Sequence, residues 1–159
     1  MSTRLEFIKS IQNKEVLPPK IIIGNNTKIC PTAKLGNEGF GFEPNENGEL
    51  VFFPHFGDVI IGNNIRIGSY VCIDRGNMHN TIIKDGVKID NLVHIAHNVH
   101  VGKNTMIVAG SVICGSVKIG KNCFIGANST VKEHLTIGNN VVIGMGSVVT
   151  KDIPDGEIW

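Results

Sequence analysis

The sequence contains no long apolar run, no strong net charge and no paired cysteine motif. Its 159 residues carry a formal net charge of +1, so charge gives no reason to expect binding to nucleic acid or to an anionic membrane. No apolar stretch approaches the roughly 20 residues that a membrane span needs, and the N-terminal residues lack the apolar segment of a secretory signal. These absences predict a single cytoplasmic domain.

The four cysteines, Cys30, Cys72, Cys114 and Cys123, show no CxxC spacing. Without a secretory signal we expect them to be reduced thiols in the core. Leucine is scarce beside isoleucine, and 19 residues are glycine. Abundant β-branching with frequent glycine favours many short strands and tight turns over a helical bundle.

An internal repeat runs through most of the chain. From Ile83 to Val149 an aliphatic residue stands at every sixth position, and the blocks Ile23–Leu35 and Ile61–Ile73 keep the same spacing. Small or β-branched residues follow most of these anchors four positions later, and pairs such as Asn63–Asn64 lie between them. Gly and Asn tolerate the positive φ of a sharp corner. A period of six therefore predicts a short strand plus a corner, repeated.

Three such strands close a triangular coil of 18 residues, so each anchor stacks on the one 18 positions later, roughly 4.8 Å away. We expect an all-β parallel β-helix over residues 21–153, with about six triangular coils. A β-sandwich is the alternative, but it gives no reason for a six-residue phase held over 67 residues.

The ends of this β-helix need covering. Residues 1–20 are expected to form a short N-terminal helix that caps one end, with Leu5, Phe7, Ile8 and Ile11 buried. At the other end only the segment from Ile153 onwards is available, and residues 154–159 form a C-terminal tail.

The repeat is interrupted twice. Residues 37–58 contain five of the seven phenylalanines and have no place inside a solenoid, so we expect a projecting Phe-rich loop. This loop either packs its own aromatic rings or faces substrate and a neighbouring subunit. Between Ile73 and Ile83 the spacing is ten, which predicts four residues inserted at a corner.

Three of the six histidines, His94, His97 and His100, form an HxxHxxH motif that invites a metal site. On a triangular coil the three side chains point apart within one chain, so we expect no metal there. Alternatively, one histidine is a general base, because its pKa suits proton transfer near neutral pH. Spacing alone does not select which one.

Residues 39–152 resemble the hexapeptide-repeat acyltransferases, and in particular UDP-3-O-acylglucosamine N-acyltransferase of lipid A synthesis. The matching stretches include GFGFEP, IDRG, KIDNLVHIAHNVHVGKNT, GSVKIGKNCFIG and EHLTIG. The resemblance implies a left-handed coil, against the general preference for right-handed crossovers. It also implies a homotrimer with active sites between subunits.

The same resemblance implies roles for individual residues. His97, in IAHN, would be the catalytic base, Asp90, in KIDN, would orient it, and His134, in EHL, would assist substrate binding or catalysis. Phe40, Phe42 and Asn98 are expected to contact substrate.

Gly115 is singled out by the repeat as well as by the resemblance. It lies 18 residues after His97, and therefore one coil above it. Its N–H could stabilise an oxyanion; the alternative is a glycine needed only for a corner.

The implied reaction moves an acyl group from acetyl-CoA or acyl carrier protein to the amine of a nucleotide-linked amino sugar. It would need no covalent intermediate and no bound cofactor. The chain resembles a short form without the N-terminal uridine-binding domain and the C-terminal helices. Three alternatives stay open: an O-acetyltransferase, a γ-carbonic-anhydrase-like zinc enzyme, and a non-catalytic β-helix scaffold.

Overall fold

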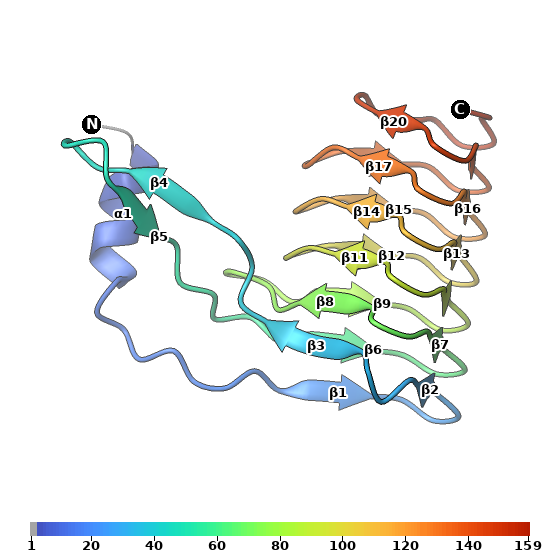
Figure 1. Ribbon diagram of the computed structural model, residues 1–159, viewed down its shortest axis with the longest axis horizontal. Helices are drawn as coiled ribbons and strands as arrows, with labels where there is room; N and C mark the ends of the chain where they lie inside the picture. The colour runs from blue at the N-terminus through green and yellow to red at the C-terminus, as the bar shows by residue number, and fades with distance from the viewer. Residues whose placement is uncertain (1–2) are drawn as a thin grey trace.

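The computed structural model describes residues 3–159, and they form a parallel β-helix in which three six-stranded sheets make the sides of a prism (Figure 1). The first sheet consists of β1 (Ile21–Ile23), β6 (Val59–Ile61), β9 (Thr81–Ile83), β12 (His100–Val101), β15 (Lys118–Ile119) and β18 (Thr136–Ile137). The second consists of β2 (Lys28–Ile29), β7 (Arg66–Ile67), β10 (Lys88–Ile89), β13 (Met106–Ile107), β16 (Phe124–Ile125) and β19 (Val142–Ile143). The third consists of β3 (Lys34–Asn37), β8 (Cys72–Asp74), β11 (His94–Ile95), β14 (Val112–Ile113), β17 (Thr130–Val131) and β20 (Val148–Val149).

Strand pairing follows the predicted register. In the second sheet Ile89 pairs with Ile107, which is the 18-residue spacing of an uninterrupted coil. Ile67 pairs with Ile89, 22 positions on, because four extra residues lie at the corner between β8 and β9. Ile29 pairs with Ile67 across the longer insertion that follows β3. Both interruptions therefore lie where the sequence predicts them.

The core is the column of repeat anchors. Every anchor from Ile61 to Val149 is at most 4% exposed, and burial of one such side chain stabilises the fold by about 1.5–3 kcal/mol. Polar members of the second inward column are satisfied, since the Thr105 and Ser111 hydroxyls donate to backbone carbonyls of the next coil. The first coil is different: Ile23 is 49% exposed because β1 is the edge strand of its sheet.

The N-terminal segment forms α1 (Thr3–Ile11), in which Leu5, Ile8 and Ile11 are buried as predicted but Phe7 is 41% exposed. The prediction that this helix caps the end of the β-helix is wrong. Ile8 and Ile11 pack against Phe53 of the 37–58 insertion instead of against the end of the coil. Figure 1 shows α1 beside this insertion, at a distance from the first coil.

The insertion does project, and it contains an antiparallel hairpin of β4 (Phe42–Pro44) and β5 (Leu50–Phe52). At the other end of the prism Ile153 pairs with Ile137, and Trp159 packs against the core. The C-terminal residues therefore continue the stack over the last coil.

All four cysteines are free, but the expectation of core thiols holds only for Cys123. Cys30, Cys72 and Cys114 are half-buried on the outer surface, because each is the neighbour of an inward anchor along the chain and points the other way. No helix among residues 3–159 is long and apolar enough to cross a membrane.

Candidate active site around His97

A hollow of about 610 Å³ lies on the outer face of the third sheet. His97 and Gly115 line it, together with Asp74, His94 and the aromatic ring of Phe40. The residues come from three consecutive coils and from the base of the insertion. The fold thus brings the predicted base and the predicted oxyanion glycine into one cavity.

The orientation of His97 is set from two sides. A methyl group placed on Gly115 would lie 2.6 Å from Cε1 and 2.7 Å from Nε2 of His97, while one on Gly39 would lie 3.0 Å from Nδ1. The ring therefore turns Nε2 toward Gly115 and Nδ1 toward the insertion. Gly115 lies over His97 as the 18-residue register predicts, and any side chain there would displace the ring.

The backbone around Gly115 leaves one donor free. Ser116 N donates to the His97 carbonyl over 2.9 Å, and His134 N donates to the Gly115 carbonyl over 3.0 Å. Within residues 3–159 no hydrogen bond uses the Gly115 N–H. This donor is available to a ligand oxygen beside Nε2.

The surroundings keep His97 in its neutral form. Burial lowers the pKa of His97, and the positive charge that His134 can carry lowers it further. His134 stands one coil above Ser116 with a φ of 64°, at a corner of the coil. A neutral imidazole at physiological pH is the form that a general base requires.

Asp74 is a site residue to which the sequence analysis gave no role, although it stands in the quoted IDRG motif. Its side chain is buried, and its Oδ2 lies 3.6 Å from Nε2 of His94. Burial raises the pKa of Asp74 to about 7 and lowers the pKa of His94. Burial therefore works against charging either member of the pair.

The next residue of that motif, Arg75, is structural. It is 3% exposed, and its guanidinium donates to the carbonyls of Gly57 and Leu17, each over 2.8 Å. These two bonds fix the end of the insertion and the N-terminal segment against the coil.

The two predicted aromatic residues differ in their surroundings. Phe40 is 92% exposed at the mouth of the hollow. The ring of Phe42 makes an edge contact with that of Phe40, with the ring centroids 5.1 Å apart. It also packs against the ring of Phe52, with the centroids 5.4 Å apart. Phe40 is therefore the ring that can meet a ligand, and Phe42 supports it.

Asn98 lies outside this hollow. Its side chain is hydrogen-bonded to Asn77 of the four-residue insertion, and it lines a different cavity together with His100. Asn98 and His97 therefore line different hollows of one chain, and the expectation that Asn98 contacts substrate stays a prediction. The histidines of the HxxHxxH motif are expected to point apart, and they do so only in part. His94 and His97 line the same hollow, whereas His100 lines the other one. Residues 3–159 hold no group of three or more His, Cys, Asp or Glu side chains arranged for a metal ion.

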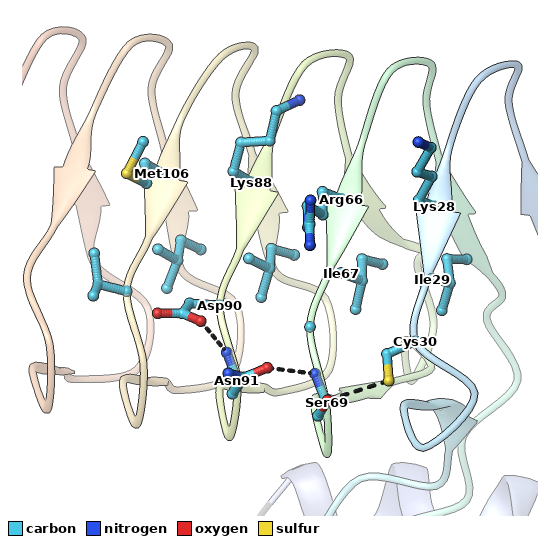
Figure 2. Close-up of a pocket in the computed structure, with 14 residues that line it drawn as sticks. Lys28, Ile29, Cys30, Arg66, Ile67, Ser69, Lys88, Asp90, Asn91 and Met106 are labelled. Carbon is cyan, nitrogen blue, oxygen red and sulfur yellow. Dashed lines mark hydrogen bonds between the residues drawn. The ribbon is translucent and has the colours of Figure 1, made fainter.

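Asp90 is also remote from His97. It follows β10 and lines a hollow of about 690 Å³ on the second sheet (Figure 2). Its carboxylate accepts a hydrogen bond from Asn91 N over 2.7 Å. Because one corner of the coil separates β10 from β11, the two residues face different sides of the prism. The prediction that Asp90 orients His97 is therefore wrong within one chain.

The hollow around Asp90 is basic. Lys28, Arg66 and Lys88 stand in register on the adjacent strands β2, β7 and β10, and Figure 2 shows their side chains following one another along the sheet. Lys88 donates to the Asn64 carbonyl, and no ion pair within residues 3–159 involves Lys28 or Arg66. By contrast, the His97 hollow is lined by carboxylates, among them Glu38 and Glu133.

The coil of repeated six-residue units defines the class of protein: a β-helix of hexapeptide repeats. Two family models agree, "Bacterial transferase hexapeptide (six repeats)" over residues 80–115 and "Hexapeptide repeat of succinyl-transferase" over residues 116–151. Residues 80–151 are thus hexapeptide repeats of the kind found in bacterial transferases.

Within that class the chain is similar to UDP-3-O-acylglucosamine N-acyltransferases. It is 50% identical over 95 residues to UDP-3-O-acylglucosamine N-acyltransferase 2 of Legionella pneumophila, which is 60% of this chain and 27% of the relative. It is 53% identical over 89 residues to the Acinetobacter baumannii enzyme, which is 56% of this chain and 25% of that one. The match thus covers about a quarter of each curated relative.

Solved structures share the fold. LpxA from Acinetobacter baumannii superposes with a TM-score of 0.74 at 26% identity, over 85% of this chain and 50% of that one. UDP-N-acetylglucosamine O-acyltransferase from Moraxella catarrhalis superposes with a TM-score of 0.75 at 25% identity, over 84% of this chain and 50% of that one. The coil is the left-handed β-helix of these neighbours.

Proposed function

We propose that this protein is an acyltransferase that moves an acyl group from a thioester donor to the amine of a nucleotide-linked amino sugar. The donor would be acetyl-CoA or an acyl carrier protein, and the reaction would take place in the cytoplasm. The observation that carries the proposal is the His97 ring, whose Nε2 faces Gly115 inside the hollow. The similarity to named N-acyltransferases supports the same reaction class.

The proposed mechanism is direct transfer. Nε2 of His97 takes a proton from the acceptor nitrogen as that nitrogen attacks the thioester carbonyl and the C–N bond forms. The carbonyl oxygen becomes an oxyanion that the Gly115 N–H stabilises. The oxyanion then collapses and the C–S bond breaks. The leaving thiolate takes up the proton that His97 holds, which returns His97 to its neutral form. Cys114 lines the hollow, but burial and the neighbouring Glu133 raise its pKa, which disfavours a thiolate nucleophile.

We further propose that the active unit is a homotrimer with its sites between subunits. The basic hollow of Lys28, Arg66 and Lys88 complements the carboxylates of the His97 hollow. Pairing of these two faces is head-to-tail, and it closes into a ring under threefold symmetry. In that ring Asp90 of one subunit would approach the open side of the neighbour's site and meet the acceptor amine. Cations directly opposite one another in a sheet repel, so a partner would relieve the Lys28–Arg66–Lys88 column.

The reaction is tested by thiol release from acetyl-CoA and acyl carrier thioesters against a panel of UDP- and dTDP-amino sugars. We expect release with an amine acceptor and its loss in His97→Ala; activity that survives this change would overturn the mechanism. The panel should include hydroxyl acceptors, because solved structures of similar fold carry the name O-acyltransferase.

The shared site is tested by subunit mixing. His97→Ala and Asp90→Asn trimers should each be nearly inactive, because each lacks one required group in every site. A trimer that contains both kinds of subunit has one intact site among its three. Since about three quarters of randomly assembled trimers are mixed, equal mixing restores roughly a quarter of wild-type activity. Failure to restore activity, with mixed trimers demonstrated by mass, would contradict a site built from two subunits. A co-assembled mixture of His97→Ala with His97→Gln is the matched control, which stays inactive.

A further inference from the structure

His55 is a buried polar residue that the reaction described above does not use. It lies at the end of the insertion and is 1% exposed. Its ring packs against the rings of Phe52 and Phe53, with centroid distances of 5.7 Å and 6.2 Å. Within residues 3–159 neither ring nitrogen makes a hydrogen bond of regular geometry, although the Phe53 backbone lies close to the ring. A phenyl ring would fill this apolar place without leaving polar atoms unpaired. A histidine here therefore calls for an explanation in terms of its nitrogens.

The ring of His55 lies directly behind the proposed base. The centroids of His55 and His97 are 5.3 Å apart with the planes at 79°, an edge-to-face contact. A methyl group on Gly39 would lie 2.6 Å from Nε2 of His55 and 3.0 Å from Nδ1 of His97. These two nitrogens therefore border the same small volume, on the side of His97 away from Gly115. Gly39 permits both rings to come this close.

A base that acts at Nε2 must carry its hydrogen on Nδ1, and that hydrogen needs an acceptor. Asp90 does not supply one, because it faces another side of the prism. No hydrogen bond from the His97 ring to a carboxylate occurs within residues 3–159. Burial, with the nearby His97, lowers the pKa of His55 to about 4, so its ring keeps a lone pair at neutral pH.

We propose that His55 is the positioning residue for His97: a ring nitrogen of His55 accepts the Nδ1–H of His97 and so holds Nε2 toward Gly115. The inference rests on the proposed role of His97 as a base, and it assigns to the insertion a part in the site that the repeat cannot provide. Contacts of this kind are often long before substrate binds and shorten in the complex.

The direct test is the tautomer of His97, measured by nitrogen-15 NMR of the imidazoles in the full-length protein without substrate. In the wild type we expect the hydrogen on Nδ1. In His55→Phe, which keeps the ring contact but removes the acceptor, we expect a mixture of tautomers. His55→Gln, whose amide oxygen can accept, should restore much of the wild-type signal. His100→Gln, on another face, is the matched control and should leave His97 unchanged. A single Nδ1–H tautomer in His55→Phe would overturn the proposal.

Kinetics and stability supply a second readout. His55→Phe should lower kcat by at least about tenfold with KM almost unchanged, while thermal stability stays level or rises. A purely structural role would leave kcat as it is or lower stability instead. The tautomer measurement does not depend on turnover. Absence of acyl transfer in every variant would thus refute the proposed function, whereas an unaltered tautomer would refute the role of His55.

Discussion

The three upper coils and the part of the molecule below them are built on different principles. In residues 100–149 the 18-residue register is unbroken and the anchors are fully buried or nearly so. In residues 3–83 two insertions shift the register, and α1 packs with the hairpin in a second, separate cluster. Figure 1 makes the contrast visible: a regular stack of coils, with α1 and the hairpin set to one side of it. The regular part supplies Gly115 and His134, and the interrupted part supplies Gly39, His55 and Phe40. The candidate site lies where the two parts meet.

Core truncation should separate the two parts most strongly. Ile113, between Ile95 and Val131 in the third sheet, is fully buried, whereas Ile29 of the first coil is half-buried. We expect Ile113→Ala to lower the free energy of unfolding by about 3–4 kcal/mol and Ile29→Ala by only about 1 kcal/mol. Urea denaturation of both variants measures the difference. Equal losses would mean that the first coil is packed as tightly as the upper ones.

A methyl group at Gly115 should harm activity more than stability. Because its Cβ would overlap the His97 ring, Gly115→Ala turns the ring away, and we expect a loss of about 100-fold in kcat. The matched control is Gly144→Ala, where the nearest atom, the Trp159 carbonyl oxygen, is 3.4 Å from the new methyl. The control should retain wild-type kcat. Steady-state kinetics and thermal melts of both variants are the measurements, and an active Gly115→Ala would remove the argument for an oxyanion site there.

Asp74 should make the protein less stable as pH rises. Its pKa is about 7 in the folded chain against an ordinary 3.8, so the folded state holds the proton more tightly and loses stability between about pH 4 and pH 7. Asp74→Asn should therefore be more stable than wild type at pH 8, on the order of 2 kcal/mol, and similar to it at pH 4.

Chemical denaturation at the two pH values checks this difference. Asp155, in the C-terminal segment that continues the stack, provides a control of opposite sign, because hydrogen bonds from Asn139 lower its pKa. Asp155→Asn should lose stability at pH 8. A stability gain confined to pH 4 in Asp74→Asn would contradict the buried, protonated carboxyl.

The smallest effect concerns His134. Since His134 helps to lower the pKa of His97, the acid limb of kcat/KM should lie below pH 6.5 in the wild type. His134→Gln removes that charge and should move the limb upward, toward the ordinary pKa of histidine. The pH profile of kcat/KM is the measurement. A limb that stays in place would show that the two histidines do not interact across the coils.

Prediction from sequence succeeds where distance along the chain fixes distance in space. The 18-residue period places Gly115 over His97, and the buried column from Ile61 to Val149 follows from the same count. It fails for Asp90, which is only seven residues from His97 but lies around a corner of the prism. The exposed Phe7 is a related failure, because the position of α1 depends on the hairpin and not on the coil.

The sequence by itself determined the β-helix, its register, the places of its two interruptions and the glycine above the candidate base. It could do so because a repeat that buries two side chains in every six residues fixes which residues of successive coils stack on one another. Only the tertiary structure decided how the insertion folds back, so that Gly39 and His55 lie against His97. In the same part of the molecule Ile8 and Ile11 pack against Phe53, two residues before His55. Contacts of this kind join segments with no common period, and no spacing in the sequence records them.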